Sequence, residues 1–273
     1  MTREVIAVDL LDRYAAVLID AYGVLVTSGG ALEGAAAFVS ELERRGMPWA
    51  VVTNDCSRSA ETAARSYAAR GVEVPASRVV TSGSLLRRFF ADRGLCGART
   101  AVMGTDDSRA YVREAGGVVV GWSEEAEVLV IGDEAGYPFL DAFDTSLSHV
   151  IARVRRGVPV TLVVPNPDIV YPKREAAYGV ASGGIASMFE QALGAVLGAE
   201  APSFERLGKP APAMFEAAME LVGTRDCVML GDQLSTDIRG ARAAGIDSAF
   251  VCTGVGELDG SVEPDWVVRR LVR

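Results

Sequence analysis

The chain has 273 residues and a mass of 28.8 kDa, with 27 basic and 36 acidic side chains and therefore a formal net charge of −9. This acidic balance argues against nucleic acid or an anionic membrane as the main partner, because both favour a basic surface. One histidine excludes histidine-rich zinc sites, and four dispersed cysteines without a CxxC pair fit a reduced protein better than a disulfide framework. With no signal-peptide pattern and no apolar run of membrane-spanning length, we expect a cytoplasmic protein.

Short apolar runs alternate with helical patterns along almost the whole chain. The runs predict strands at residues 15–19, 49–52, 79–81, 100–103, 128–131, 160–164, 227–230 and 248–252. Helices are predicted at 34–45 and 59–70, each followed by a glycine that can adopt the left-handed conformation of a helix end. A further helix, 139–156, carries an apolar stripe beside which His149 lies, and we expect His149 to be solvated. The repeated order strand, helix, strand predicts a mostly parallel sheet and an α/β fold.

Polar residues follow three of the predicted strands. Asp20 follows the first strand, Thr53 and Asn54 follow the second, and Asp232 follows the strand at 227–230 after one glycine. In a parallel sheet these residues share the edge formed by the carboxyl ends of the strands. Asp237 comes five positions after Asp232, at the start of a predicted helix. Three carboxylates in one pocket repel one another unless a divalent cation neutralises them, and all-oxygen ligands together with a substrate phosphate suit Mg²⁺.

A lysine completes this set of polar residues. Lys209 lies in a Gly-Lys-Pro triplet that precedes a helix expected to begin near residue 213. Each residue taken alone has a plainer interpretation, because an aspartate at a strand end commonly caps a turn and a lysine is commonly solvated. Their occurrence together and in this order favours a site in which Lys209 and the hydrogen-bonding residues Thr53 and Asn54 hold phosphate oxygens.

Four short motifs, present in order, resemble those of the haloacid dehalogenase (HAD) superfamily. They are DAYGVL at 20–25, VVTN at 51–54, GKP at 208–210 and GDQLSTD at 231–237. The long insert between the second and third motifs, with Asn166-Pro167-Asp168, is similar to subfamily IIA, the NagD-like and pyridoxal-phosphate-phosphatase-like group. This resemblance implies a Rossmann-like core with a parallel sheet, at residues 1–85 and 175–273, and an inserted α/β cap domain at residues 86–174.

The resemblance also implies roles for individual residues. Asp20 would attack the substrate phosphorus and form an aspartyl-phosphate. The implied Mg²⁺ ligands are Asp20, the main-chain carbonyl of Tyr22, Asp232 and Asp237. The residues expected to bind phosphoryl oxygens are Thr53, Asn54 and Lys209. Asn166 and Asp168 would shape the pocket for the leaving group, although a tight turn explains these two residues equally well.

The first motif departs from the family pattern at Tyr22, where most phosphatases of the superfamily have a second aspartate. That aspartate protonates the leaving group, and a phenol with a pKa near 10 is a poor substitute. One interpretation is a phosphatase that uses another proton donor or prefers good leaving groups. The others are a weakened homologue that binds or senses a phosphorylated ligand, and a dehalogenase-like hydrolase, which would not need Asp232 and Asp237.

We therefore predict a Mg²⁺-dependent phosphohydrolase that acts on a small phosphorylated metabolite, a sugar phosphate or a similar phosphomonoester. The resemblance also suggests a homodimer.

Overall fold

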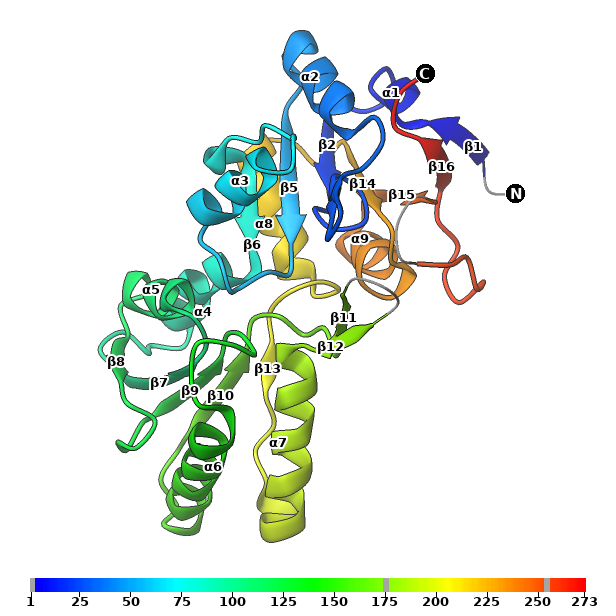
Figure 1. The fold of residues 1–273 in the computed structure, drawn as a ribbon. Coiled ribbons are helices and arrows are strands. Elements are labelled where there is room, and N and C mark those ends of the chain that lie inside the picture. Colours follow the sequence, from blue (N-terminus) through cyan, green and yellow to red (C-terminus); the bar gives the residue numbers. More distant parts are fainter. Residues whose placement is uncertain (1–2, 174–176, 253–255) are drawn as a thin grey trace. The chain divides into compact units, whose positions relative to one another are not determined.

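The computed structural model describes residues 3–173, 177–252 and 256–273, and its chain divides into two compact units (Figure 1). The core unit consists of Met1–Thr53, Ala60–Val80 and Lys209–Arg273. The inserted unit consists of Asn54–Ser59 and Thr81–Gly208. In the described part of the chain, no helix combines the length and the apolar character that crossing a membrane requires.

A seven-stranded sheet lies at the centre of the core unit. In order across the sheet, its strands are β1 (Arg3–Ile6), β16 (Trp266–Arg270), β15 (Asp247–Val251), β14 (Cys227–Gly231), β2 (Ala16–Ile19), β5 (Trp49–Thr53) and β6 (Val79–Thr81). In this spatial order, each strand from β1 across the sheet to β5 pairs in parallel with the next one. From β2 the chain continues through β5 and β6 on one side, and it returns through β14, β15 and β16 on the other. The strand order therefore changes direction between β2 and β14, which is where ligands bind in sheets of this kind.

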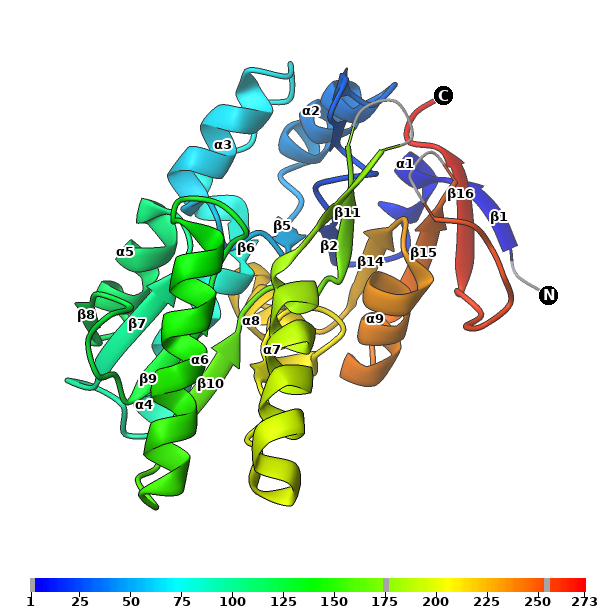
Figure 2. The same cartoon turned by 60° about the horizontal axis from the view of Figure 1, so that its bottom comes forward.

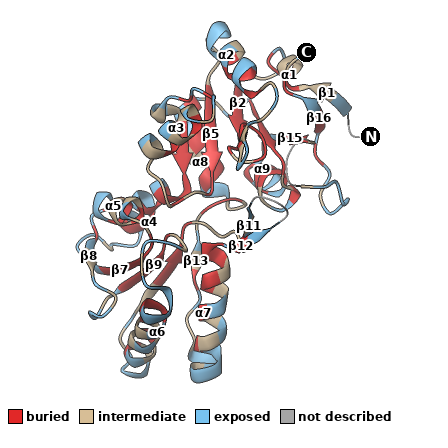
Figure 3. Cartoon of the chain, in the orientation of Figure 1, coloured by how far each residue is buried: buried red, intermediate tan, exposed pale blue. Residues whose placement is uncertain are grey.

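Helices pack on both faces of this sheet. One apolar cluster joins alternate residues of β2 and β5 to the helices α1 (Ala7–Leu10), α2 (Ala35–Arg45) and α3 (Ala60–Ala68). On the other side, α8 (Pro212–Val222) contacts β5 and α9 (Arg239–Ala244) contacts β15. All residues of β2, β5 and β14 are buried (Figure 3), which explains why these strands are continuous apolar runs in the sequence. The smaller elements are the antiparallel pair β3 (Val26–Thr27) and β4 (Gly30–Ala31), and a 3₁₀ turn, η1 (Ala76–Arg78).

The inserted unit has a parallel sheet of its own. In order across the sheet, its strands are β13 (Glu205–Arg206), β10 (Thr161–Val164), β9 (Val128–Ile131), β7 (Arg99–Met103) and β8 (Val118–Val120). Two long helices, α6 (Phe139–Arg155) and α7 (Ser182–Leu197), lie side by side (Figure 2) and pack on one face of the sheet. On the other face are α4 (Leu86–Asp92) and α5 (Asp106–Glu114). The remaining elements are the 3₁₀ turns η2 (Ser82–Leu85) and η3 (Gly198–Glu200), and an antiparallel pair, β11 (Val170–Pro172) and β12 (Tyr178–Val180).

The segment Asn54–Ser59 follows a core strand but packs with the inserted unit. The Ser108 hydroxyl donates to the carbonyl oxygen of Cys56 at 2.9 Å, and the Thr105 hydroxyl donates to that of Ser57 at 2.7 Å. Both donors lie at or before the first turn of α5. The carbonyl groups of Cys56 and Ser57 are therefore satisfied by the inserted unit, as buried main-chain groups require.

The structure confirms the α/β fold with a Rossmann-like parallel sheet and an inserted α/β domain. The eight predicted strands and the three helices predicted with both bounds are all present, and their ends differ from the prediction by at most two residues. The inserted unit contains more of the chain than the expected residues 86–174, because it also includes the segment before α3 and continues to Gly208. Its extension has a physical cause: α7 supplies apolar side chains to the inserted core and β13 pairs with β10. The expected boundary between residues 174 and 175 lies outside the described residues.

Candidate active site

Asp20 lies directly after β2, at the point where the strand order changes direction. Its main-chain N–H donates to the carbonyl oxygen of Leu230 at 2.8 Å, which continues the pairing between β2 and β14. Its carboxylate oxygen Oδ1 accepts the N–H of Ala21 at 2.7 Å. The residue is 6% exposed, so its carboxylate is held almost out of contact with bulk solvent.

Asp232 and Asp237 follow the neighbouring strand β14. One π-helical turn, η4 (Leu234–Ile238), brings Asp237 back toward the end of this strand, and both aspartates are fully buried. Oδ2 of Asp237 accepts the N–H of Gln233 at 3.1 Å, which fixes the carboxylate inside the turn. Such π-helical turns are frequent at functional sites.

Two glycines make room for these carboxylates. A Cβ atom on Gly231 would lie 2.2 Å from Cβ of Asp237, so no larger residue fits at this end of β14. A Cβ atom on Gly23 would lie 2.1 Å from Oδ2 of Asp232, and Gly23 also has a φ of +91°. Gly23 is therefore required both by its left-handed backbone and by its contact with a carboxylate.

Lys209 links two of the three aspartates. Its ammonium nitrogen Nζ lies 2.7 Å from Oδ1 of Asp20 and 2.6 Å from Oδ1 of Asp237. The lysine is 2% exposed and precedes α8, whose first residue is Pro212. Burial of an ammonium group is costly unless it is paired, and here two carboxylates pair with it.

The charges at this site shift the pKa values of two of its members. Burial raises the pKa of Asp20 well above its usual range, and the negative charges of Asp237 and Asp232 raise it further, against the opposing effect of Lys209. Burial disfavours the charged form of Lys209, but its ion pairs and hydrogen bonds with Asp20 and Asp237 outweigh burial, so its pKa is raised. The site thus holds more negative charge than its single lysine neutralises.

The three aspartates fit a divalent cation. Asp20, Asp232 and Asp237 each offer a carboxylate oxygen, and these oxygens lie within 4.8 Å of one another. Hard oxygen ligands of this kind suit Mg²⁺. A cation among them would also relieve the repulsion that raises the pKa of Asp20.

Thr53 and Tyr22 also belong to the core unit. Thr53 is the last residue of β5, the strand beside β2, and it is 4% exposed. Tyr22 is half-buried, and its ring packs against the apolar cluster of the core. The guanidinium carbon of Arg70 lies 5.9 Å from the centre of this ring, a cation–π contact on the same side chain.

The other predicted site residues belong to the inserted unit. Asn54 donates through Nδ2 to Oδ1 of Asp168 at 2.9 Å, and it is 6% exposed. Asn166 accepts the N–H of Asp168 on its side-chain oxygen at 3.0 Å, so the tight turn expected for these two residues is present. Within the core unit the structure therefore brings Asp20, Asp232, Asp237 and Lys209 together. Within the inserted unit it brings together Asn54, Asn166 and Asp168.

Two family models match most of the chain outside its middle region. A model described as haloacid dehalogenase-like hydrolase matches residues 17–117, and a HAD-hydrolase-like model matches residues 206–273. A solved structure titled as a possible sugar phosphatase of the HAD superfamily, from Cytophaga hutchinsonii, is 27% identical with a TM-score of 0.85. The match covers 100% of this chain and 99% of that one. The chain belongs to the HAD superfamily.

Two further relatives of this HAD-superfamily chain are named for their substrates. An acid sugar phosphatase from Staphylococcus aureus is 27% identical over 251 residues, which are 91% of this chain and 90% of the relative. A glycerol phosphate phosphatase from Mycobacterium tuberculosis, solved in complex with calcium, is 25% identical with a TM-score of 0.80. That match covers 96% of this chain and 75% of the other.

Sequence reasoning missed the residues that shape the HAD site without carrying charge. Gly23 and Gly231 adjoin the first and fourth motifs, and a glycine next to a motif aspartate is a signal that could have been used. The dipeptide Gly183-Gly184 has the composition of a loop turn, but it forms part of a helix. Both residues lie in the first turn of α7, where a Cβ on Gly183 would lie 2.1 Å from the carbonyl oxygen of Pro167.

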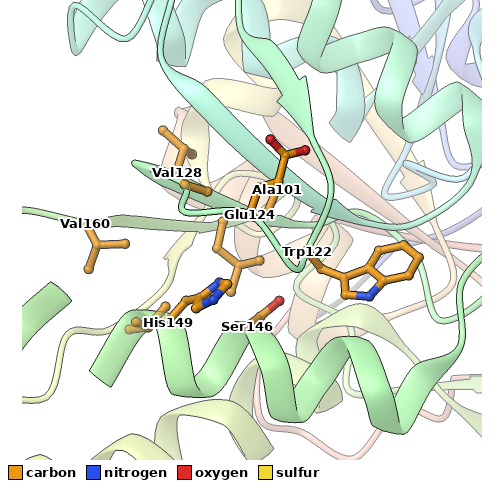
Figure 4. A pocket seen from close by; sticks show the side chains of 10 residues that line it. Ala101, Trp122, Glu124, Val128, Ser146, His149 and Val160 are labelled. Atoms are coloured by element: carbon orange, nitrogen blue, oxygen red, sulfur yellow. The ribbon is translucent and has the colours of Figure 1, made fainter. Parts of the chain in front are cut away.

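The single histidine of this HAD chain also differs from expectation. His149 is half-buried rather than fully solvated, and it lines a small pocket of the inserted unit (Figure 4). Other residues that line the pocket include Trp122, Glu124 and Ser146. Val150, a residue of the predicted apolar stripe, lines the same pocket. His149 lies at the edge of this stripe and is therefore partly covered.

Proposed function

We propose that this HAD-type phosphatase hydrolyses sugar phosphates or similar phosphomonoesters with Mg²⁺ and through an aspartyl-phosphate on Asp20. The substrate class is supported by the names of the Cytophaga and Staphylococcus relatives. The requirement for a divalent cation is supported by the three clustered carboxylates and by the calcium complex of the mycobacterial relative.

The observation that carries the proposal is the convergence of four buried charged side chains where the strand order changes direction. Three are the aspartates Asp20, Asp232 and Asp237, and the fourth is Lys209. Burial of these charges is costly for stability, so a merely structural role would not favour them. A functional role explains the cost, because the carboxylates can bind a cation and the ammonium group can bind an anion.

The chemistry assigned to the protein is a double displacement. A carboxylate oxygen of Asp20 attacks phosphorus, and the bond from phosphorus to the leaving oxygen breaks, with its electron pair remaining on that oxygen. Water then attacks the phosphorus of the aspartyl-phosphate, which releases inorganic phosphate and restores Asp20. Lys209, Thr53 and Asn54 bind the phosphoryl oxygens in this proposal, and Lys209 offsets their negative charge.

The predicted ligands would hold Mg²⁺ through carboxylate oxygens of Asp20, Asp232 and Asp237 and the carbonyl oxygen of Tyr22. When bound, Mg²⁺ would supply positive charge against the phosphoryl oxygens. It would also favour the ionised form of Asp20, which is the form that attacks.

A second candidate function rests on Tyr22. Its side chain is a phenol and not a carboxylic acid, and its ring packs on the core cluster and against Arg70, so it does not replace the acid that would protonate the leaving group. Loss of such assistance typically lowers a rate by about 10²–10⁴-fold. A protein that binds a phosphorylated ligand and turns it over slowly is therefore the alternative.

The decisive experiment measures release of inorganic phosphate from a panel of sugar phosphates by the purified chain, with Mg²⁺ and with EDTA. We expect turnover that requires Mg²⁺ and falls about 10⁴-fold or more in Asp20→Asn. The matched control is Asp141→Asn, an exposed aspartate at the start of α6, which should behave as wild type. Full activity of Asp20→Asn would refute the covalent mechanism. Tight binding of phosphate without turnover would favour the second candidate, and metal-independent release of halide from 2-haloacids would favour a dehalogenase.

A further inference from the structure

We infer that Asp168 is a positioning residue that fixes the side-chain amide of Asn54 for phosphate binding. The inference rests on the proposed function, in which Asn54 binds a phosphoryl oxygen. Its basis is the hydrogen bond from Nδ2 of Asn54 to Oδ1 of Asp168 at 2.9 Å, which lies entirely within the inserted unit. An ionised carboxylate only accepts hydrogen bonds, so it selects the amide orientation in which nitrogen faces Asp168.

The opposite side of the same amide is also constrained. A Cβ atom on Gly208 would lie 2.5 Å from Oδ1 of Asn54, so the amide oxygen lies close against Gly208, where only a glycine fits. The main chain of Asn54 is held as well, because the Ser82 hydroxyl donates to its carbonyl oxygen at 2.6 Å. With the nitrogen, the side-chain oxygen and the main chain all fixed, the second N–H of the planar amide has a defined direction. A preorganised donor of this kind loses little conformational entropy when it binds an anion.

Asp168 is itself held in place by its surroundings. Its N–H donates to the side-chain oxygen of Asn166 at 3.0 Å, and its carbonyl oxygen accepts the N–H of Gly183 at 3.0 Å. A Cβ atom on Gly183 would lie 2.1 Å from the carbonyl oxygen of Pro167, so this glycine lets the first turn of α7 contact the turn at 166–168. Asn166 and Gly183 thus gain an explanation, because both hold the main chain that carries the Asp168 carboxylate.

The charge of Asp168 argues against a direct contact with the substrate. A carboxylate close to a phosphate dianion is repelled by it, whereas a carboxylate that accepts a hydrogen bond from Asn54 polarises the amide and strengthens it as a donor. Asp168 therefore acts through Asn54, and the coupling between the two residues is what an experiment can measure.

The test uses the full chain, a sugar phosphate that the wild type hydrolyses, and inorganic phosphate as a competitive inhibitor. We expect Asp168→Ala to raise both KM and the inhibition constant of phosphate about tenfold while kcat changes little, because a hydrogen bond to a charged group is lost. Asp168→Asn has a side chain of the same shape that retains an acceptor oxygen, so it should keep most of the affinity for phosphate. Asp144→Ala, which removes an exposed aspartate of α6, is the matched control and should leave both constants unchanged.

The double variant separates a positioning role from an independent one. In an Asn54→Ala background, Asp168→Ala should cause no further rise in the inhibition constant of phosphate, and a second tenfold rise would overturn the inference. If Asp168→Ala does not fold, Asp168→Glu is used instead, because it keeps the charge but displaces the acceptor oxygen. It should also raise KM and the inhibition constant of phosphate. Unchanged constants in that variant also overturn the inference. A wild-type chain that neither hydrolyses sugar phosphates nor binds phosphate refutes the proposed function instead.

Discussion

Replacement of Lys209 by methionine isolates the contribution of its two ion pairs. The side chain is 2% exposed and contacts carboxylate oxygens of Asp20 and Asp237 at 2.7 and 2.6 Å. Methionine has a similar length and fills the same apolar space without the charge. The variant therefore removes the lysine charge from a group that contains three buried carboxylates.

The loss of folding stability in this variant can be worked out from protonation of one carboxyl group, which is the change that removes the excess negative charge at the lowest free energy. Holding a proton at pH 7 on a group with an ordinary pKa of 3.8 costs about 4 kcal/mol, at 1.36 kcal/mol for each pH unit. This agrees with the 3–5 kcal/mol that is typical when one partner of a buried ion pair is removed. Because the folded variant then holds a proton that the unfolded chain releases, its stability falls as the pH rises. The deficit should shrink to about 1–2 kcal/mol at pH 5.

The measurement is thermal and urea unfolding in EDTA at pH 5 and pH 7, repeated with Mg²⁺. Lys209→Met should unfold on the order of 10 °C below wild type at pH 7. Mg²⁺ should recover part of this loss, because a bound cation stabilises the folded state that binds it. The other lysine of the chain, Lys173, is exposed, and Lys173→Met should change stability by less than about 0.5 kcal/mol. A deficit that is absent at pH 7, or equal at both pH values, would refute the electrostatic reasoning.

Three further predictions concern other residues. Gly23→Ala should destabilise the protein by about 2–3 kcal/mol and abolish stabilisation by Mg²⁺, because its Cβ would clash with Asp232. The control is Gly46→Ala, since Gly46 has a φ of +63° but open space around its Cβ. In the same unfolding assay this control should cost only about 1 kcal/mol and retain the Mg²⁺ effect. Burial raises the pKa of Asp133 to about 6. Its carboxyl group therefore favours folding below pH 4 and loses this contribution as the pH rises through 6. After allowance for solvent screening, Asp133→Asn should be about 1 kcal/mol more stable than wild type above pH 7 and as stable as wild type at pH 4. Tyr22→Asp should raise kcat about 10²-fold on sugar phosphates but little on 4-nitrophenyl phosphate, whose leaving group needs no proton, and equal changes on both would contradict this account.

Local signals in the sequence predicted most of the core. Strands buried on both faces are continuous apolar runs, and an aspartate at the end of such a run identifies the carboxyl edge of the sheet. Asp20 and Asp232 could therefore be assigned to the same edge of the sheet before it was known that their strands are neighbours. The edge strand β1 and its neighbour β16 were not predicted, because β1 is exposed along half its length and only the first three residues of β16 are buried.

Features that depend on contacts between distant segments could not be predicted in this way. Gly183 and Gly184 have the composition of a loop turn, yet they begin α7, because their missing side chains admit the main chain of residues 167–169. The two interactions of Lys209 likewise depend on side chains from two different strand ends. The hydrogen bond between Asn54 and Asp168 joins residues that are 114 positions apart, and no local pattern contains such a pairing.

The division of the chain into two units has a consequence for protein engineering. The chain passes between the units at four peptide bonds, and two of these bonds lie inside the second and third HAD-like motifs, between Thr53 and Asn54 and between Gly208 and Lys209. A chimera that exchanged only residues 81–208 with a relative would combine Asp168 of one protein with Asn54 of another. Transfer of substrate preference between members of the family therefore requires residues 54–59 to be exchanged together with the insert, so that the asparagine and the carboxylate that orients it stay matched.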